Sequence, residues 1–186
     1  PQICNLLAPL KGIRMYPGFE LQRDMIHTLG HNWEYMQFID RESIDYNLSA
    51  VDFGKLEQLN TFRVSSKSLC DLLQSAVHLK KVRLIQPDMN CQETEHALAN
   101  ILERCHEVQY VEVSETQKPA ENSEDDHANE QLCYAALNGI ERGVFRTKHQ
   151  QRNSLHIHIQ SRLELNAPEV DAWVFRIGRI VNWLQS

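Results

Sequence analysis

Short runs of alternating apolar and polar residues recur along the chain at regular intervals. Most runs follow the pattern apolar-x-x-apolar-x-apolar, whose last three positions alternate like a β-strand with one buried face. The third run ends in Thr61, and the sixth is a degenerate copy that ends in Leu155-x-Ile157. The middle apolar positions of successive runs are separated by 23, 23, 23, 26 and 47 residues. Three equal spacings indicate a structural repeat rather than a chance alternation. The middle positions are Ile13, Met36, Leu59, Val82, Val108 and Leu155.

Stretches with a helical period follow most of these predicted strands. They predict helices over residues 19–29, 67–77, 92–104 and 130–141, and a last helix over residues 167–185. Ser66 and Ser68 are candidate N-caps of the second of these helices, and Pro168 suits the first turn of the last one. We expect the last helix to cap the final repeat with an apolar stripe of Val170, Trp173, Val174, Ile177, Ile180, Val181 and Leu184.

A strand followed by a helix, repeated about every 20–29 residues, resembles the leucine-rich repeat proteins over nearly the whole chain. The divergent, helix-backed repeats are most similar to the substrate-binding domains of F-box proteins. The resemblance implies an α/β solenoid with short parallel strands on its concave face and helices on its convex face. It also implies a single domain over residues 1–186 with about five to six repeats. The alternative is an ordinary open α/β or α+β domain with evenly spaced strands.

The composition is that of an ordinary folded domain, with 42% hydrophobic and 24% charged residues. No apolar run reaches the roughly 18–20 residues of a bilayer-spanning helix, so we expect no membrane segment. Five cysteines without a C-x-x-C pair favour a reduced, intracellular protein, cytoplasmic or nuclear. Because the chain starts at Pro1 and its first apolar residues lack a polar cap, we expect a fragment of a longer protein.

The alternation of strand side chains predicts which residues lie on the concave face. The first column on this face is polar and consists of Arg14, Gln37, Asn60, Arg83, Gln109 and His156. The second is mostly apolar or aromatic and consists of Tyr16, Ile39, Phe62, Ile85, Val111 and His158. Exposed apolar patches often mark interaction sites, so the second column, with Arg83 and His156, is the candidate partner-binding set. The alternatives are that another segment covers the column or that the strand register differs.

Charge is concentrated in two neighbouring segments. The net charge is −6, and residues 114–130 carry six acidic residues against one lysine. We expect an acidic loop insertion at residues 115–129. The basic cluster that follows is a candidate site for RNA, other phosphates or an acidic peptide, with pairing to the acidic loop as the alternative. The cluster consists of Arg142, Arg146, Lys148, Arg152 and Arg162.

The sequence lacks the common catalytic motifs. It contains no G-x-S-x-G, no glycine-rich phosphate loop and no H-E-x-x-H, so we expect no enzyme and no cofactor. A zinc site formed by Cys91, His96, Cys105 and His106 is disfavoured because a helix separates the two cysteines. His156 and His158 share a strand face, where a polar surface is favoured over a metal site.

We therefore predict a non-catalytic protein-binding domain that recruits a partner on its strand face. The resemblance to F-box proteins implies that this partner is a substrate of a cullin-type ubiquitin ligase. One alternative is an RNA-associated adaptor, similar to the leucine-rich repeat domain of nuclear RNA-export factors. Another is homotypic assembly through the apolar column or the last helix. The sequence leaves the partner and the oligomeric state open.

Overall fold

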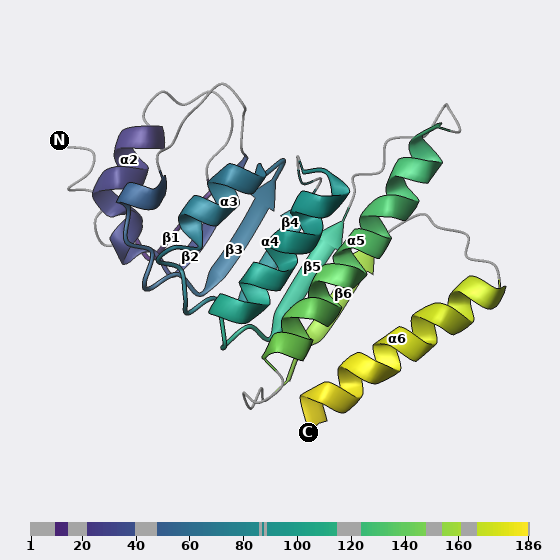
Figure 1. The fold of residues 1–186 in the computed structure, drawn as a ribbon. Helices are drawn as coiled ribbons and strands as arrows, with labels where there is room; N and C mark the ends of the chain where they lie inside the picture. Colours follow the sequence, from purple (N-terminus) through teal and green to yellow (C-terminus); the bar gives the residue numbers. More distant parts are fainter. Residues whose placement is uncertain are drawn as a thin grey trace.

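The fold is an α/β arrangement with one six-stranded parallel sheet (Figure 1). The computed structural model describes residues 10–14, 22–39, 48–85, 87, 89–114, 124–147, 154–160 and 167–185. The strands lie side by side in the order in which they occur in the chain. They are β1 (Gly12–Arg14), β2 (Tyr35–Ile39), β3 (Gln58–Phe62), β4 (Lys81–Ile85), β5 (Tyr110–Ser114) and β6 (His156–Gln160).

Helices connect these strands and cover one face of the sheet (Figure 1). Each connection returns the chain to the start of the next strand, which parallel pairing requires. The α-helices within the described residues are α2 (Gln22–Leu29), α3 (Ser66–Leu72), α4 (Cys91–Arg104), α5 (Glu124–Arg146) and α6 (Ala167–Gln185). Two short 3₁₀ helices, η1 (Gly30–Asn32) and η2 (Leu48–Ala50), flank β2.

The strand register confirms the repeat for the first four strands and corrects it for the last two. Ile13, Met36, Leu59 and Val82 are direct partners across β1 to β4, as their 23-residue spacing predicts. In β5 the partner of Val82 is Val111 rather than Val108, and in β6 the aligned residue is Ile157 rather than Leu155. The prediction failed in β5 because Val108, Val111 and Val113 repeat the apolar spacing three residues further along the chain.

The core lies between the sheet and the helices. Leu59, Val82, Leu84, Val111 and Val113 point from their strands into this layer and are buried there. Buried residues of the helices and loops meet them, and the largest are Trp33, Phe53, Leu69 and Leu72. Thr61 is the one polar strand residue at these core positions among the described residues, and its hydroxyl donates to the carbonyl of Arg83 over 3.4 Å.

Helices α4 and α5 pack so closely that their contact requires glycine. A Cβ atom on Gly139 would lie 2.4 Å from the carbonyl oxygen of Glu95, and one on Gly143 would lie 2.8 Å from Cβ of Leu102. Real side chains do not tolerate such distances, so the two glycines, one helical turn apart on α5, let the backbones approach.

The described helices lie where the sequence predicts them, but α3 ends at Leu72 rather than at residue 77, and α5 runs over Glu124–Arg146 rather than over residues 130–141. Ser65, not Ser66 or Ser68, caps α3 by accepting a hydrogen bond from the amide of Ser68. Helix α5 begins at Glu124, so residues 124–129 are helical and the prediction of a loop there was wrong. Residues 115–123 lie outside the described part.

Within the described residues, no helix is both long enough and apolar enough to cross a membrane.

Candidate functional site

The face of the sheet opposite the helices forms the candidate site. We call it the open face, because in Figure 1 the labelled helices lie on the other side of the strands. The strand residues that alternate with the core positions lie on it. Its members whose side chains the structure describes are Arg14, Tyr35, Gln37, Gln58, Asn60, Phe62, Lys81, Arg83, Ile85, Tyr110, Glu112, Ser114, His156, His158 and Gln160.

A guanidinium–carboxylate pair lies at the centre of the open face. Nε of Arg83 donates to Oε2 of Glu112 over 2.7 Å, and Nη2 donates to Oε1 over 2.9 Å. The hydroxyl of Tyr110 donates to the same Oε2 over 2.8 Å. These fork-shaped, charge-assisted bonds hold all three side chains in one orientation.

Contacts within this cluster shift the pKa values of Glu112 and Tyr110. The Arg83 guanidinium holds the pKa of Glu112 below its usual range, and the Tyr110 hydrogen bond acts in the same direction. Glu112 in turn raises the pKa of Tyr110 by accepting its hydroxyl hydrogen bond. The side chain of Glu112 is only 7% exposed, so its charge depends on these partners.

Two more contacts fix aromatic rings beside this cluster. The hydroxyl of Tyr35 donates to Oε1 of Gln37 over 2.8 Å. The ammonium of Lys81 lies 4.9 Å from the centre of the Tyr110 ring, within the range of a cation–π interaction. Glu112 is the only carboxylate among the described open-face residues, and Arg83 neutralises it, so the ammonium of Lys81 adds positive charge to the face.

Phe62 and Ile85 form an apolar end of the open face, where β3 and β4 end. They are register partners and are half-buried. Arg63 follows Phe62 with a φ of 57°, and it is the one non-glycine residue with positive φ among those described. A side chain in this conformation is strained, and such strain is often found at functional positions. The guanidinium of Arg63 lies 5.9 Å from the centre of the Phe62 ring.

Only some of the predicted partner-binding residues lie on the open face. Phe62, Ile85, Arg83, His156 and His158 lie on the open face. Val111 does not, because the register shift in β5 turns it into the core, where it is 1% exposed; its prediction as a surface residue was wrong.

The register of β5 and β6 also changes which residues continue the two predicted columns. Ser114 and Gln160, not Val111 and His158, continue the column of Phe62 and Ile85. Glu112 and His158, not Gln109 and His156, continue the column of Arg83. Ile39 lies in β2, but its side-chain environment is not described, and Tyr16 lies outside the described residues.

The predicted basic cluster is paired within the protein where the structure describes it. Arg142 bonds to Glu95 over 3.1 Å and Arg146 bonds to Glu103 over 2.6 Å, so both arginines of α5 neutralise carboxylates of α4. The partners are on α4 rather than in the predicted acidic loop. Lys148, Arg152 and Arg162 lie outside the described residues.

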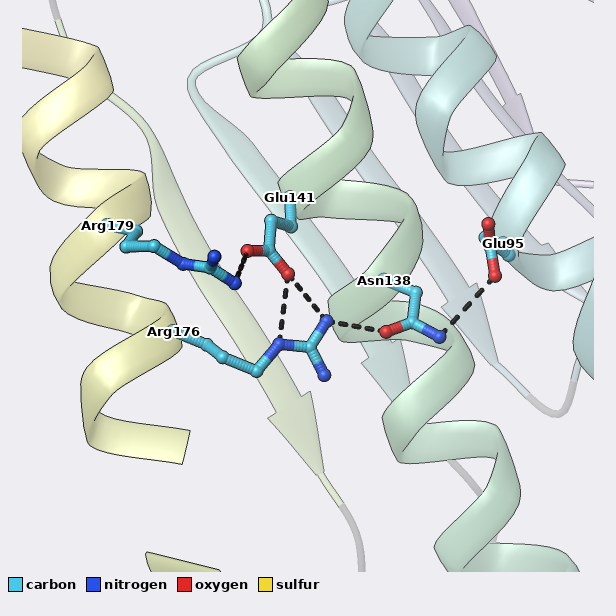
Figure 2. A network of polar contacts seen from close by, with 5 residues as sticks. All are labelled: Glu95, Asn138, Glu141, Arg176 and Arg179. Carbon is cyan, nitrogen blue, oxygen red and sulfur yellow. Dashed lines mark hydrogen bonds and ion pairs between the residues drawn. The ribbon is translucent and has the colours of Figure 1, made fainter. Parts of the chain in front are cut away.

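Sequence reasoning missed a second polar network, which joins α5 and α6. Figure 2 shows Glu141 of α5 accepting hydrogen bonds from Arg176 and Arg179 of α6. Arg176 also donates to the amide oxygen of Asn138, whose nitrogen donates to Glu95 on α4. Arg176 and Arg179 are one turn apart on α6, but only the packing of α6 beside α5 could identify Glu141 as their common partner.

The histidines and cysteines form no metal centre in the described part of the chain. No group of three potential ligands converges there, and His156 and His158 are exposed on β6. Cys70, Cys91, Cys105 and Cys133 are free thiols. Cys105 is buried and donates to the carbonyl of Ala76 over 3.2 Å, which is the behaviour of a core residue.

Comparison of the chain with protein-family models, curated proteins and solved structures gives no match.

Proposed function

We propose that the chain is a leucine-rich repeat solenoid that binds a protein partner on its open face. Three features support the solenoid: the sequential strand order, the single continuous register and the equal 23-residue spacing of β1 to β4. In repeat proteins of this kind, function lies in an extended surface presented by successive units rather than in one catalytic pocket.

The observation that carries the binding proposal is the fixed set of aromatic and guanidinium side chains at the centre of the open face. Tyrosine and arginine are the residue types enriched at the energetic centres of protein interfaces. Tyr35, Arg83 and Tyr110 are already held by Gln37 and Glu112, so a partner would lose less conformational entropy in ordering them.

The charge and shape of the open face define the class of partner that we propose. Lys81 favours acidic side chains, while Phe62 and Ile85 favour apolar ones at the end of the strands. The partner that fits both is a protein segment in which acidic residues flank one or more large apolar residues.

The resemblance to the substrate-binding domains of F-box proteins supports a cellular role for such binding. In that role, the domain delivers the bound protein to a cullin-type ubiquitin ligase. The expected observation is that the bound protein is ubiquitinated more slowly in cells that carry a variant with an altered open face.

Charge reversal on the open face tests the binding proposal. Lysate proteins captured by the wild-type chain are compared with those captured by a Lys81→Glu variant. Lys67→Glu, an exposed position on α3, is the matched control on the helix layer. Loss of an acidic partner from the open-face variant alone supports the proposal. The same partners on all three proteins, or none on the wild type, contradict it.

The same preparation distinguishes a protein partner from RNA. We expect capture to survive ribonuclease treatment. Capture that ribonuclease abolishes would assign the open face to nucleic acid instead.

A further inference from the structure

Helix α6 has one side packed against the protein and one apolar side facing away from it. Trp173 and Ile180 join the hydrophobic core, and Arg176 bonds to Glu141 (Figure 2). On the remaining sides four large apolar residues are exposed, and no other labelled helix or strand lies beyond α6 in Figure 1. The exposed fractions are 63% for Val174, 68% for Phe175, 47% for Ile177 and 43% for Val181.

Gly178 lies in the middle of this apolar side, and no neighbour among the described residues requires a glycine there. A Cβ atom added to it would meet nothing within 4 Å. A glycine in a helix interior costs about 1 kcal/mol relative to alanine. In α5, by contrast, Gly139 and Gly143 are needed because the backbone and side chains of α4 approach them within 3 Å. By the same reasoning, Gly178 fits a second helix that approaches α6 from outside.

The pattern around Gly178 is complementary to itself. Val174, Ile177, Gly178 and Val181 are spaced by three, one and three residues, so the stripe reads the same in both directions along the helix. In an antiparallel pair related by a two-fold axis, Ile177 lies opposite the partner's Gly178 and Val174 lies opposite the partner's Val181. The large side chain of each copy then fills the space that the missing side chain of the other leaves.

We propose that α6 pairs in this way with α6 of a second copy of the chain, which forms a symmetric dimer through the stripe centred on Ile177 and Gly178. Two-fold dimers with such an isologous contact are the commonest homo-oligomers. This interface is separate from the open face, so the dimer would present two open faces.

The size and charge of the surface agree with a weak dimer. The three apolar side chains of the stripe are 63%, 47% and 43% exposed, so each copy offers the surface of about one and a half fully exposed aliphatic side chains. The apolar part of a standard interface is roughly 450 Å² per partner. Arg176 and Arg179 are held toward Glu141, and the stripe itself contains no charged residue, so two copies meet without like-charge repulsion.

Sedimentation equilibrium of the wild-type chain over a range of concentrations tests the dimer. The mass is expected to rise from 21.6 kDa at low concentration toward twice that value. A dissociation constant on the order of 10–100 μM is expected for an interface of this size. A mass that stays at that of the monomer up to several hundred micromolar, about tenfold above this range, overturns the proposal.

The variant Gly178→Leu separates the interface from the stability of the fold. Its side chain meets open space within one copy and removes a helix-interior glycine, so the melting temperature of the dilute protein is expected to rise. It also fills the space opposite Ile177, so the dissociation constant is expected to rise at least about tenfold. Adding Ile177→Ala is expected to restore part of the affinity.

Two further variants complete the test. Val174→Glu places a charge in the stripe at an exposed position and is expected to abolish association. Lys81→Glu on the open face is expected to leave it unchanged. Association that survives both Gly178→Leu and Val174→Glu assigns the contact to another surface and refutes the proposal.

Discussion

Replacing Arg83 with methionine is expected to destabilise the fold by about 2 kcal/mol at neutral pH. The substitution removes two hydrogen bonds of 2.7 and 2.9 Å to Glu112. Each hydrogen bond to a charged group contributes about 1.5–3 kcal/mol. The loss is smaller than the full sum because the side chain of Arg83 is 37% exposed, so water screens the pair and can reach the carboxylate. Two kcal/mol corresponds to a decrease of about 4–8 °C in the melting temperature.

The pH dependence of this effect identifies its cause. In the wild type the pKa of Glu112 is lowered, so its stabilising contribution is present above its usual pKa and is lost as the pH falls through the lowered value. In Arg83→Met the buried carboxylate has lost its guanidinium, and protonation relieves the cost of its charge. The difference in unfolding free energy between the two proteins should therefore shrink as the pH is lowered toward 4, about the usual pKa of a glutamate.

Urea unfolding of both proteins between neutral and acidic pH measures this difference. Arg146→Met is the control, because Arg146 and Glu103 form an exposed pair with side chains 49% and 28% exposed. Its cost should be below about 1 kcal/mol. If Arg83→Met costs no more than this control, or if its cost does not change with pH, the account of the Arg83–Glu112 pair is wrong.

Three other substitutions test the packing. Thr61→Val should raise the free energy of unfolding in urea by up to about 1 kcal/mol, because the fully buried hydroxyl makes only a 3.4 Å hydrogen bond. A lower free energy of unfolding would show that this bond stabilises the fold. Gly143→Ala should lower the melting temperature by the equivalent of about 1–3 kcal/mol, because its Cβ would lie 2.8 Å from Cβ of Leu102; a stabilised variant would contradict the close α4–α5 contact. Glu141→Ala should speed amide hydrogen exchange in α6 about tenfold, because Arg176 and Arg179 lose their common acceptor; unchanged exchange would show that the network does not hold α6.

The sequence predicted the first four strands well because each carries a single run of the repeat pattern at the same spacing. Met36, Leu59 and Val82 follow each other at 23 residues and pair directly in the sheet. In the fifth strand two overlapping apolar triplets compete, one centred on Val108 and one on Val111, and both residues are buried. Local pattern could not choose between them, because only pairing with β4 fixes the register.

The candidate site was only partly predictable for the same reason. Phe62, Ile85 and Arg83 were placed correctly because their strands were in register. Glu112 was missed because the shifted register assigned its place to Gln109.

The pairing of the α5 arginines could not be predicted from the pattern of one helix. Glu95 lies 47 residues before Arg142, and Glu103 lies 43 residues before Arg146. These pairs depend on the close packing of α4 and α5 at Gly139 and Gly143.

The most direct test of protein binding on the open face is site-specific photo-crosslinking in cells. A photoreactive amino acid at Gln58, an exposed open-face position in β3, is compared with the same amino acid at Gln92, an exposed position on α4. The account predicts a discrete crosslinked protein from position 58, lost in the Lys81→Glu variant, and none of that protein from position 92. Crosslinks to the same protein from position 92 alone would place the binding surface on the helix layer and contradict the account.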